Sequence, residues 1–138
     1  MKNLIVSLFL GFVSLTSHAQ VTELDLAHIK ASEAVFDYAF GNNNEAYEAF
    51  NECYGSELLK NGSVFPELQC AIDLEKNVPN SAAASEAASK AILGYATARG
   101  GEAFKSFKNC YDQITPGDVR STHLTLVCAL EMDKNFPR

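Results

Sequence analysis

The feature of this sequence that most constrains its fold is an internal duplication. Residues 31–54 align without gaps with residues 88–111, and the segment CAIDLEKNVPN that follows matches CALEMDKNFPR, with one residue added in the loop between. A repeat of this length indicates one supersecondary unit used twice. The matching positions include aromatic, cysteine and proline pairs: Tyr38/Tyr95, Phe50/Phe107, Cys53/Cys110, Cys70/Cys128 and Pro79/Pro137.

Each copy reads as three helices, because apolar residues recur at helical spacing and no stretch alternates as a strand does. Thr22 with Asp25 three residues later is typical of a helix start. The second helix is expected to begin near Glu45 or Glu102, and the third near Pro66 or Ser121. The intervening loops are expected at Gly41–Asn44 and Arg99–Gly101, then at Gly55 with Asn61-Gly62, and at Pro116-Gly117-Asp118.

These patterns predict an all-α fold, a disulfide-stapled helical bundle built from two tandem three-helix repeats. Repeat one covers residues of about 20–80 and repeat two of about 81–138. A chain of 138 residues with 47% hydrophobic residues suits one domain. A half of about 60 residues buries little surface by itself. We therefore expect residues 20–138 to form a single helical domain around a shared core.

The first 19 residues read as a secretory signal peptide. Lys2 precedes an apolar stretch from Leu4 to Leu15, and small polar residues lead to a cleavage site after Ala19. That stretch would rise only about 18 Å as a helix, too short to span a bilayer. The mature chain is expected to begin at Gln20 in an oxidising extracellular or periplasmic space, with no membrane span. Asn61-Gly62-Ser63 is an N-glycosylation pattern that matters only in a eukaryotic source.

Four cysteines allow three pairings. Because Cys53 and Cys70 are equivalent to Cys110 and Cys128, the favoured arrangement closes one bridge inside each half. A zinc site lacks the close cysteine pairs of structural zinc centres, and a redox pair would need a C-x-x-C motif. Structural bridges are the preferred interpretation, with no metal and no cofactor.

No constellation of residues points to catalysis. His28 and His123 are the two histidines after the signal peptide, and they are not equivalent in the repeat. The motifs of hydrolases, zinc proteases and phosphate-binding loops are missing from the sequence. Each histidine is interpreted as an ordinary surface or core residue, and we expect a protein that is not an enzyme.

Charge is divided unevenly between the halves. Residues 20–80 hold 11 acidic and 3 basic residues, whereas residues 81–138 hold 6 acidic and 7 basic ones. The whole chain has a formal net charge of −6, which disfavours nucleic acid as a partner. An exposed acidic helical face carrying Glu45, Glu48 and Glu52 is the predicted contact for a protein partner.

The second helix of each half is also rich in aromatic residues. Core packing accounts for them most simply, but tyrosine hydroxyls in an apolar setting also suit a cavity that holds a small apolar ligand. The candidate cavity residues are Tyr47, Phe50, Tyr54, Phe104, Phe107 and Tyr111.

The function expected from the sequence is therefore a secreted, non-catalytic binding protein that acts on a protein partner through its charged helical face. Two alternatives stay open. One is a carrier of a small apolar ligand in a helix-lined cavity, and the other is a bacterial periplasmic inhibitor or immunity-type protein.

Overall fold

Six helices account for most of the chain that the structure describes. A computed structural model describes residues 20–40, 44–60, 65–74 and 82–138, so the predicted signal peptide lies outside the described residues. No strand occurs in those ranges, which confirms the all-α class. The helices are α1 (Glu23–Phe40), α2 (Asn44–Leu59), α3 (Pro66–Leu74), α4 (Ala82–Arg99), α5 (Gly101–Tyr111) and α6 (Ser121–Asn135).

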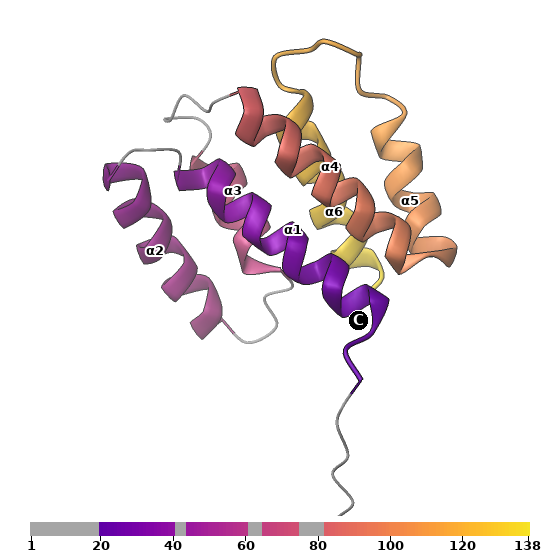
Figure 1. The fold of residues 1–138 in the computed structure, drawn as a ribbon, viewed down its shortest axis with the longest axis horizontal. Coiled ribbons are helices and arrows are strands. Elements are labelled where there is room, and N and C mark those ends of the chain that lie inside the picture. Colours follow the sequence, from indigo (N-terminus) through magenta and orange to yellow (C-terminus); the bar gives the residue numbers. More distant parts are fainter. Residues whose placement is uncertain (1–19, 41–43, 61–64, 75–81) are drawn as a thin grey trace, which may run out of the picture.

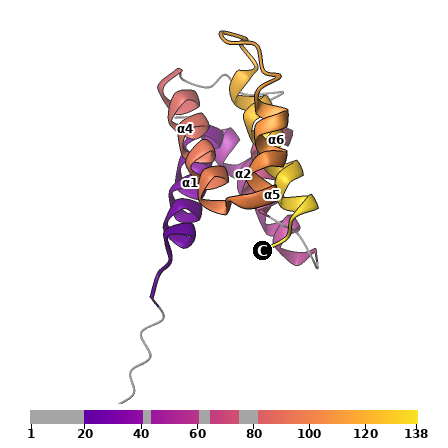
Figure 2. The same cartoon turned by 90° about the vertical axis from the view of Figure 1, so that its right-hand side faces the viewer.

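The helices form two layers with a helix on each flank. Helices α1 and α4 lie side by side and make the most extensive contact in the molecule, with α3 and α6 behind them (Figure 1). Helices α2 and α5 occupy opposite flanks, and Figure 2 shows α1 and α4 on the side of the molecule away from α6. Each flanking helix contacts the other two helices of its own half, and α2 does not contact α5.

Helix starts follow the local sequence signals. At α1, the Asp25 backbone N–H donates to Thr22 Oγ1 (3.1 Å) and the Thr22 N–H donates to Asp25 Oδ2 (2.9 Å). This reciprocal pair satisfies two amide groups that the first turn leaves without helical partners. Helices α3 and α6 begin at Pro66 and Ser121, as predicted.

Two of the expected loops have the predicted turn chemistry. Of the expected loop Arg99–Gly101, Gly100 alone separates α4 from α5, and it and Gly101 have φ of 62° and 53°, a region that costs a side-chain-bearing residue free energy. Residues 115–118 form a turn in which the Asp118 N–H donates to the Thr115 carbonyl (3.1 Å), with Gly117 at φ 81°. The residue order Pro116-Gly117 suits a type II turn. The expected loop residues 41–43 and Asn61-Gly62 lie outside the described residues.

One loop expectation is wrong. Gly55 was expected in the turn after the second helix, but it lies inside α2, which continues to Leu59. A single helical glycine costs only about 1 kcal/mol relative to alanine, and Glu57 and Leu58 beyond it are good helix formers. An ion pair between Glu57 and Lys60 supports the last turn.

The core draws on the same positions of both aligned segments. The buried residues and the apolar side chains packed against them form one hydrophobic cluster with contributions from all six helices. Both halves contribute large buried side chains to this cluster, so the two halves pack around a common interior. The matching buried pairs are Ala31/Ala88, Val35/Ile92, Tyr38/Tyr95, Ala39/Ala96, Phe50/Phe107, Leu68/Leu126, Cys70/Cys128 and Ala71/Ala129.

Two disulfides link the flanking helices α2 and α5 to the layer formed by α3 and α6. Cys53 on α2 is bonded to Cys70 on α3, and Cys110 on α5 is bonded to Cys128 on α6. This is the arrangement with one bridge in each half that the sequence favours. The described part of the chain contains no free cysteine.

Candidate binding sites

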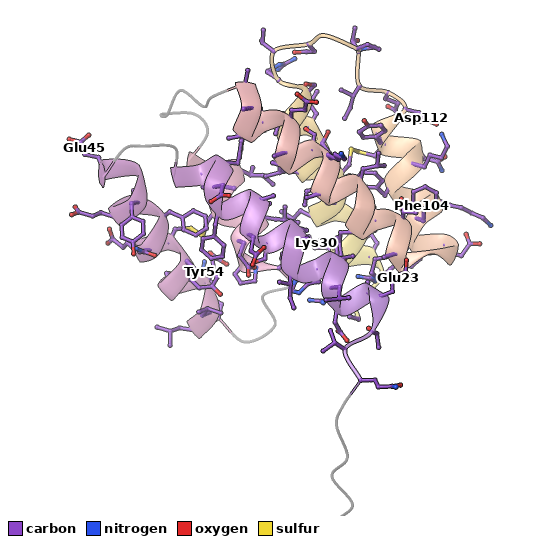
Figure 3. The ribbon with its side chains drawn as sticks, viewed as in Figure 1. Glu23, Lys30, Glu45, Tyr54, Phe104 and Asp112 are labelled. Carbon is purple, nitrogen blue, oxygen red and sulfur yellow. A yellow bond between two sulfur atoms is a disulfide. The ribbon has the colours of Figure 1, made fainter. Side chains whose placement is uncertain are left out.

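The six candidate cavity residues do not gather around one space. Tyr47 is 51% exposed, whereas Phe50 and Phe107 are buried. Figure 3 shows Tyr54 and Phe104 on opposite flanks of the molecule, as expected for helices α2 and α5 that do not touch. Contacts of α1 with α4 and of α3 with α6 join the two halves, so the aromatic stripes of α2 and α5 face their own halves instead of each other.

Within each half, the aromatic residues pack against neighbours on the same helix. The Phe50 and Tyr54 rings are stacked with centroids 6.0 Å apart, and the Phe107 and Tyr111 rings are stacked at 5.5 Å. Such residues one helical turn apart lie on the same face. This geometry supports core packing for Phe50 and Phe107, whereas Tyr54 and Tyr111 are partly exposed and line separate hollows.

The three acidic residues proposed for partner contact are all exposed. Glu45, Glu48 and Glu52 lie on α2, with Glu45 at the outer end of that helix (Figure 3). Tyr47, half exposed, lies on the same helix. The structure therefore leaves this acidic surface accessible, on the flank of the molecule.

One hollow is a groove between α1 and α4, which we call the α1–α4 groove. It encloses about 890 Å³ and is open to solvent. Leu26 and Leu93 stand beside it with 50% and 36% exposure, although both are large apolar side chains. Lys30 and Glu23 lie along α1 beside α4 (Figure 3). The lining residues are Glu23, Leu26, Ala27, Lys30, Ala87, Lys90, Ala91, Leu93, Gly94, Thr97 and Ala98.

A second, smaller hollow lies where α1, α2 and α3 meet the segment after α6. It encloses about 350 Å³, and we call it the His28 hollow. His28 contributes from α1, with its ring centroid 4.7 Å from that of Phe65. Glu67, on α3, also lines it, and its carboxylate accepts a hydrogen bond from Ser32 Oγ (2.9 Å). The remaining lining residues are Tyr54, Leu58, Pro66, Pro137 and Arg138.

The His28 hollow perturbs the titration of two of its residues. Burial lowers the pKa of His28, and the positive charge of Arg138 lowers it further. Burial raises the pKa of Tyr54, and the negative charge of Glu67 adds to that rise. Perturbed titratable groups in a concave site are a physical indication of a functional site.

A third hollow of about 480 Å³ lies between α4, α5 and the loop before α6. It is lined in part by Tyr111, Asp112 and Thr125. Tyr54 and Tyr111, which are equivalent in the repeat, thus each line a different hollow.

A buried polar cluster joins α4 to α6. The Tyr95 hydroxyl lies 2.9 Å and 2.8 Å from the two carboxylate oxygens of Asp133, and Arg99 pairs with the same carboxylate. The side chains of Asp133 and Arg99 are 0% and 7% exposed. Burial raises the pKa of Tyr95 to about 12, and it also raises the pKa of Asp133 against the hydrogen bond from Tyr95 and the charge of Arg99. Since these groups satisfy one another away from solvent, the cluster acts as a structural lock.

Sequence reasoning missed the His28 hollow. It treated His28 as an ordinary residue and assigned no role to Glu67 or Arg138. The available signal was a polar residue at a core-facing position: Glu67 precedes Leu68 in the helix that carries Cys70, and its equivalent in the second half is Thr125. No pattern placed the segment after α6 beside α1, because that contact joins residues 110 positions apart.

Among the described residues, no group of three or more histidine, cysteine, aspartate and glutamate side chains is placed to hold a metal ion. None of the helices in those ranges has the length and apolar character required to cross a membrane.

No protein-family model, curated protein sequence or solved structure matches this chain.

Proposed function

We propose that this is a secreted, non-catalytic binding protein that holds a helical segment of a partner protein in the α1–α4 groove. The observation that carries the proposal is the groove itself, an open channel of about 890 Å³ flanked by exposed leucines. A groove with exposed apolar walls suits the apolar face of an amphipathic helix, which docks through residues spaced three and four positions apart.

Small side chains give the groove its depth. The lining contains the small residues Ala27 on α1 and Ala91, Gly94 and Ala98 on α4. The larger side chain of Leu26 lies beside them and is half exposed. A partner's larger apolar side chains can therefore approach the α4 backbone closely. Burying such side chains contributes about 25 cal/mol for each Å² of apolar surface removed from water.

Charge at the groove favours an acidic partner segment. Lys30 and Lys90, one from each helix, line the groove and are exposed, and Glu23 lies near the start of α1. Charges at the margin of an interface chiefly steer association and select partners. We infer that the partner segment carries glutamate or aspartate on either side of its apolar face.

We further propose that the molecule consists of two tandem three-helix units, α1–α3 and α4–α6, in one domain. Matching buried positions and one disulfide in each half support this organisation. The helix contacts support it too, because α1–α2, α1–α3 and α2–α3 each have a counterpart among α4–α6. In this organisation the groove lies between equivalent helices, so duplication itself creates the binding surface.

Secretion remains part of the proposal. Two disulfides are typical of proteins that mature in an oxidising compartment. The mass of the protein recovered from the culture medium or periplasm tests this point. A chain beginning at Gln20 supports export with removal of the signal peptide, whereas a retained Met1 contradicts it.

The acidic surface of α2 is the alternative contact for a protein partner. Glu45, Glu48 and Glu52 are exposed, but none of them lines any of the three hollows. An inhibitor of a toxin or hydrolase could bind its partner either through the α1–α4 groove or through the acidic surface of α2. A carrier of a small apolar ligand could use the same groove, and binding of an apolar dye without binding of peptides would indicate that function.

Two model peptides test the groove proposal. Each is a helical peptide of about 18 residues with the same leucine stripe, one flanked by glutamate and the other by lysine. Fluorescence anisotropy should show tighter binding of the glutamate peptide. Reversing both Lys30 and Lys90 to glutamate should weaken that binding by roughly tenfold.

A pair of glycine substitutions separates groove binding from binding elsewhere. A Cβ atom added at Gly94 or at Gly55 would meet no atom within 4 Å, so both helices tolerate a side chain there. Gly94→Leu should fill the groove and abolish binding, whereas Gly55→Leu on α2 should leave it unchanged. Equal binding by the two variants, or no binding of either peptide by the parent protein, refutes the groove proposal. Preference for the lysine peptide, lost when Glu45, Glu48 and Glu52 are reversed to lysine, would assign binding to α2 instead.

A further inference from the structure

The His28 hollow presents a buried carboxylate with unused hydrogen-bonding capacity. Glu67 is only 7% exposed, yet it lines the hollow. Among the described residues, Ser32 Oγ is its one hydrogen-bond donor, at 2.9 Å from Oε1. An ionised carboxylate offers about four acceptor positions, and burying one with few donors is unfavourable. A ligand that brings N–H groups to Glu67 would remove that cost.

A positive charge lies on another side of the same hollow. Arg138 Nη2 is 3.2 Å from His28 Nε2. Because a guanidinium can only donate, a hydrogen bond between these atoms requires Nε2 as the acceptor, and burial together with the charge of Arg138 lowers the pKa of His28. One imidazole nitrogen uses only part of the guanidinium, whose five N–H groups match a carboxylate well. The hollow thus carries one negative and one positive charge on separate elements.

Apolar surface lies beside the two charges. Phe65 is 2% exposed and has a φ of 63°, which is costly for a bulky residue, and its ring packs against those of His28 and Tyr95. Leu58 on α2 is 58% exposed and lines the hollow with Tyr54, which is labelled in Figure 3. The Tyr54 ring also contacts the ring of Phe36 on α1. These groups give an apolar side chain a surface to cover.

We propose that the His28 hollow binds a small apolar zwitterion, a free amino acid with an aliphatic side chain. Its ammonium group donates to Glu67, its carboxylate accepts from Arg138, and its side chain packs against Phe65 and Leu58. The volume of about 350 Å³ is within the range of small-molecule sites. A simple amine would bring a cation near Arg138 uncompensated, and a simple acid would bring an anion near Glu67. The zwitterion satisfies both charges, and its site is separate from the α1–α4 groove.

Three matched compounds test the proposal by isothermal titration calorimetry: L-leucine, 3-methylbutylamine and 4-methylpentanoate. They share an aliphatic chain and differ in the charged groups they carry. Leucine should bind at least about tenfold more tightly than either analogue, because each analogue leaves one site charge without its partner. Glu67→Gln should weaken leucine binding by at least about tenfold, since the amide keeps an acceptor for Ser32 but lacks the charge.

Asp73→Asn provides the matched control. Asp73 lies on the same helix, is exposed, and accepts from Gln69 Nε2 (3.1 Å) outside the hollow. This variant should bind leucine as the parent does. Arg138→Gln, at an exposed position, should weaken binding in the same way as Glu67→Gln and decides the matter if the latter does not fold. The proposal fails if leucine gives no binding up to about 10 mM. It also fails if Glu67→Gln or, should that variant not fold, Arg138→Gln binds leucine as tightly as the parent does, or if either analogue binds as tightly as leucine.

Discussion

Among the described residues, each half buries one carboxylate, and the surroundings of the two differ. In the second half, Asp133 is fully buried, with Tyr95 donating to it and Arg99 as its counter-ion. In the first half, Glu67 is almost as buried but faces a hollow and has one described donor, Ser32. A carboxylate with complete partners locks two helices together, whereas one with incomplete partners leaves capacity for a ligand.

The two carboxylates do not occupy equivalent positions of the repeat. The counterpart of Glu67 is Thr125, whose hydroxyl donates to the Ser121 carbonyl of its own helix (2.8 Å). The counterpart of Asp133 in the sequence is Glu75, and that of Arg99 is Asn42. The apolar core positions are thus shared between the halves, whereas the buried carboxylate of Glu67 has a hydroxyl, that of Thr125, as its counterpart.

Removing the charge of Asp133 is expected to have the largest effect on stability. Asp133→Asn leaves the buried guanidinium of Arg99 without a counter-ion, which typically costs about 3–5 kcal/mol. Urea unfolding followed by circular dichroism measures the loss. Glu67→Gln is the matched change in the first half and should alter the free energy of unfolding by about 1 kcal/mol or less.

If Asp133→Asn unfolds the protein outright, a double variant still tests the lock. Asp133→Leu together with Arg99→Met removes both charges, and replacing a buried ion pair with apolar residues is often close to neutral. The double variant should therefore be more stable than Asp133→Asn. Equal losses from Asp133→Asn and Glu67→Gln would break the contrast between the two carboxylates.

The two disulfides offer a test of how similar the halves are. Their sequence separations are 17 and 18 residues, so the loops that they close in the unfolded chain are nearly equal. Replacing either pair by alanine should cost about 3 kcal/mol in the chain-entropy account. Thermal and urea unfolding of the two double variants, Cys53→Ala/Cys70→Ala and Cys110→Ala/Cys128→Ala, measure the effect. Clearly unequal losses would show that the halves contribute differently to the unfolding transition.

The helices and the bridges could be predicted from the sequence because both depend on local or repeated signals. The Thr22–Asp25 pair marks the start of α1, and Pro66 marks that of α3. Cysteines in step with a duplication favour pairing within each half. In these places local preference and the repeat indicate the same structure, which is the condition under which sequence reasoning succeeds.

The binding sites could not be predicted in the same way because they depend on how the halves meet. The α1–α4 groove needs the packing of two helices whose sequences are far apart, and their small residues read as ordinary helix formers. The His28 hollow needs Arg138 beside α1, a contact with no local signal. The ligand cavity expected at the aromatic residues of α2 and α5 stays a prediction, since periodicity shows which face of a helix is apolar but not which helix covers it.

The smallest expected effect concerns Gly55, where the helix of the first half continues and the turn expectation was wrong. Gly55 is helical and a Cβ there meets no atom within 4 Å, so Gly55→Ala should stabilise the protein by about 0.5–1 kcal/mol through helix propensity. Gly100, the residue before α5, provides the contrast in the second half: its φ of 62° disfavours a side chain, so Gly100→Ala should destabilise the protein by about 1 kcal/mol. The urea unfolding midpoints of the two variants, compared with that of the parent, show whether the stability changes have these opposite signs. A loss of stability in Gly55→Ala would mean that residue 55 needs the conformational freedom of a turn, and that α2 ends one turn earlier, much as α5 ends at Tyr111.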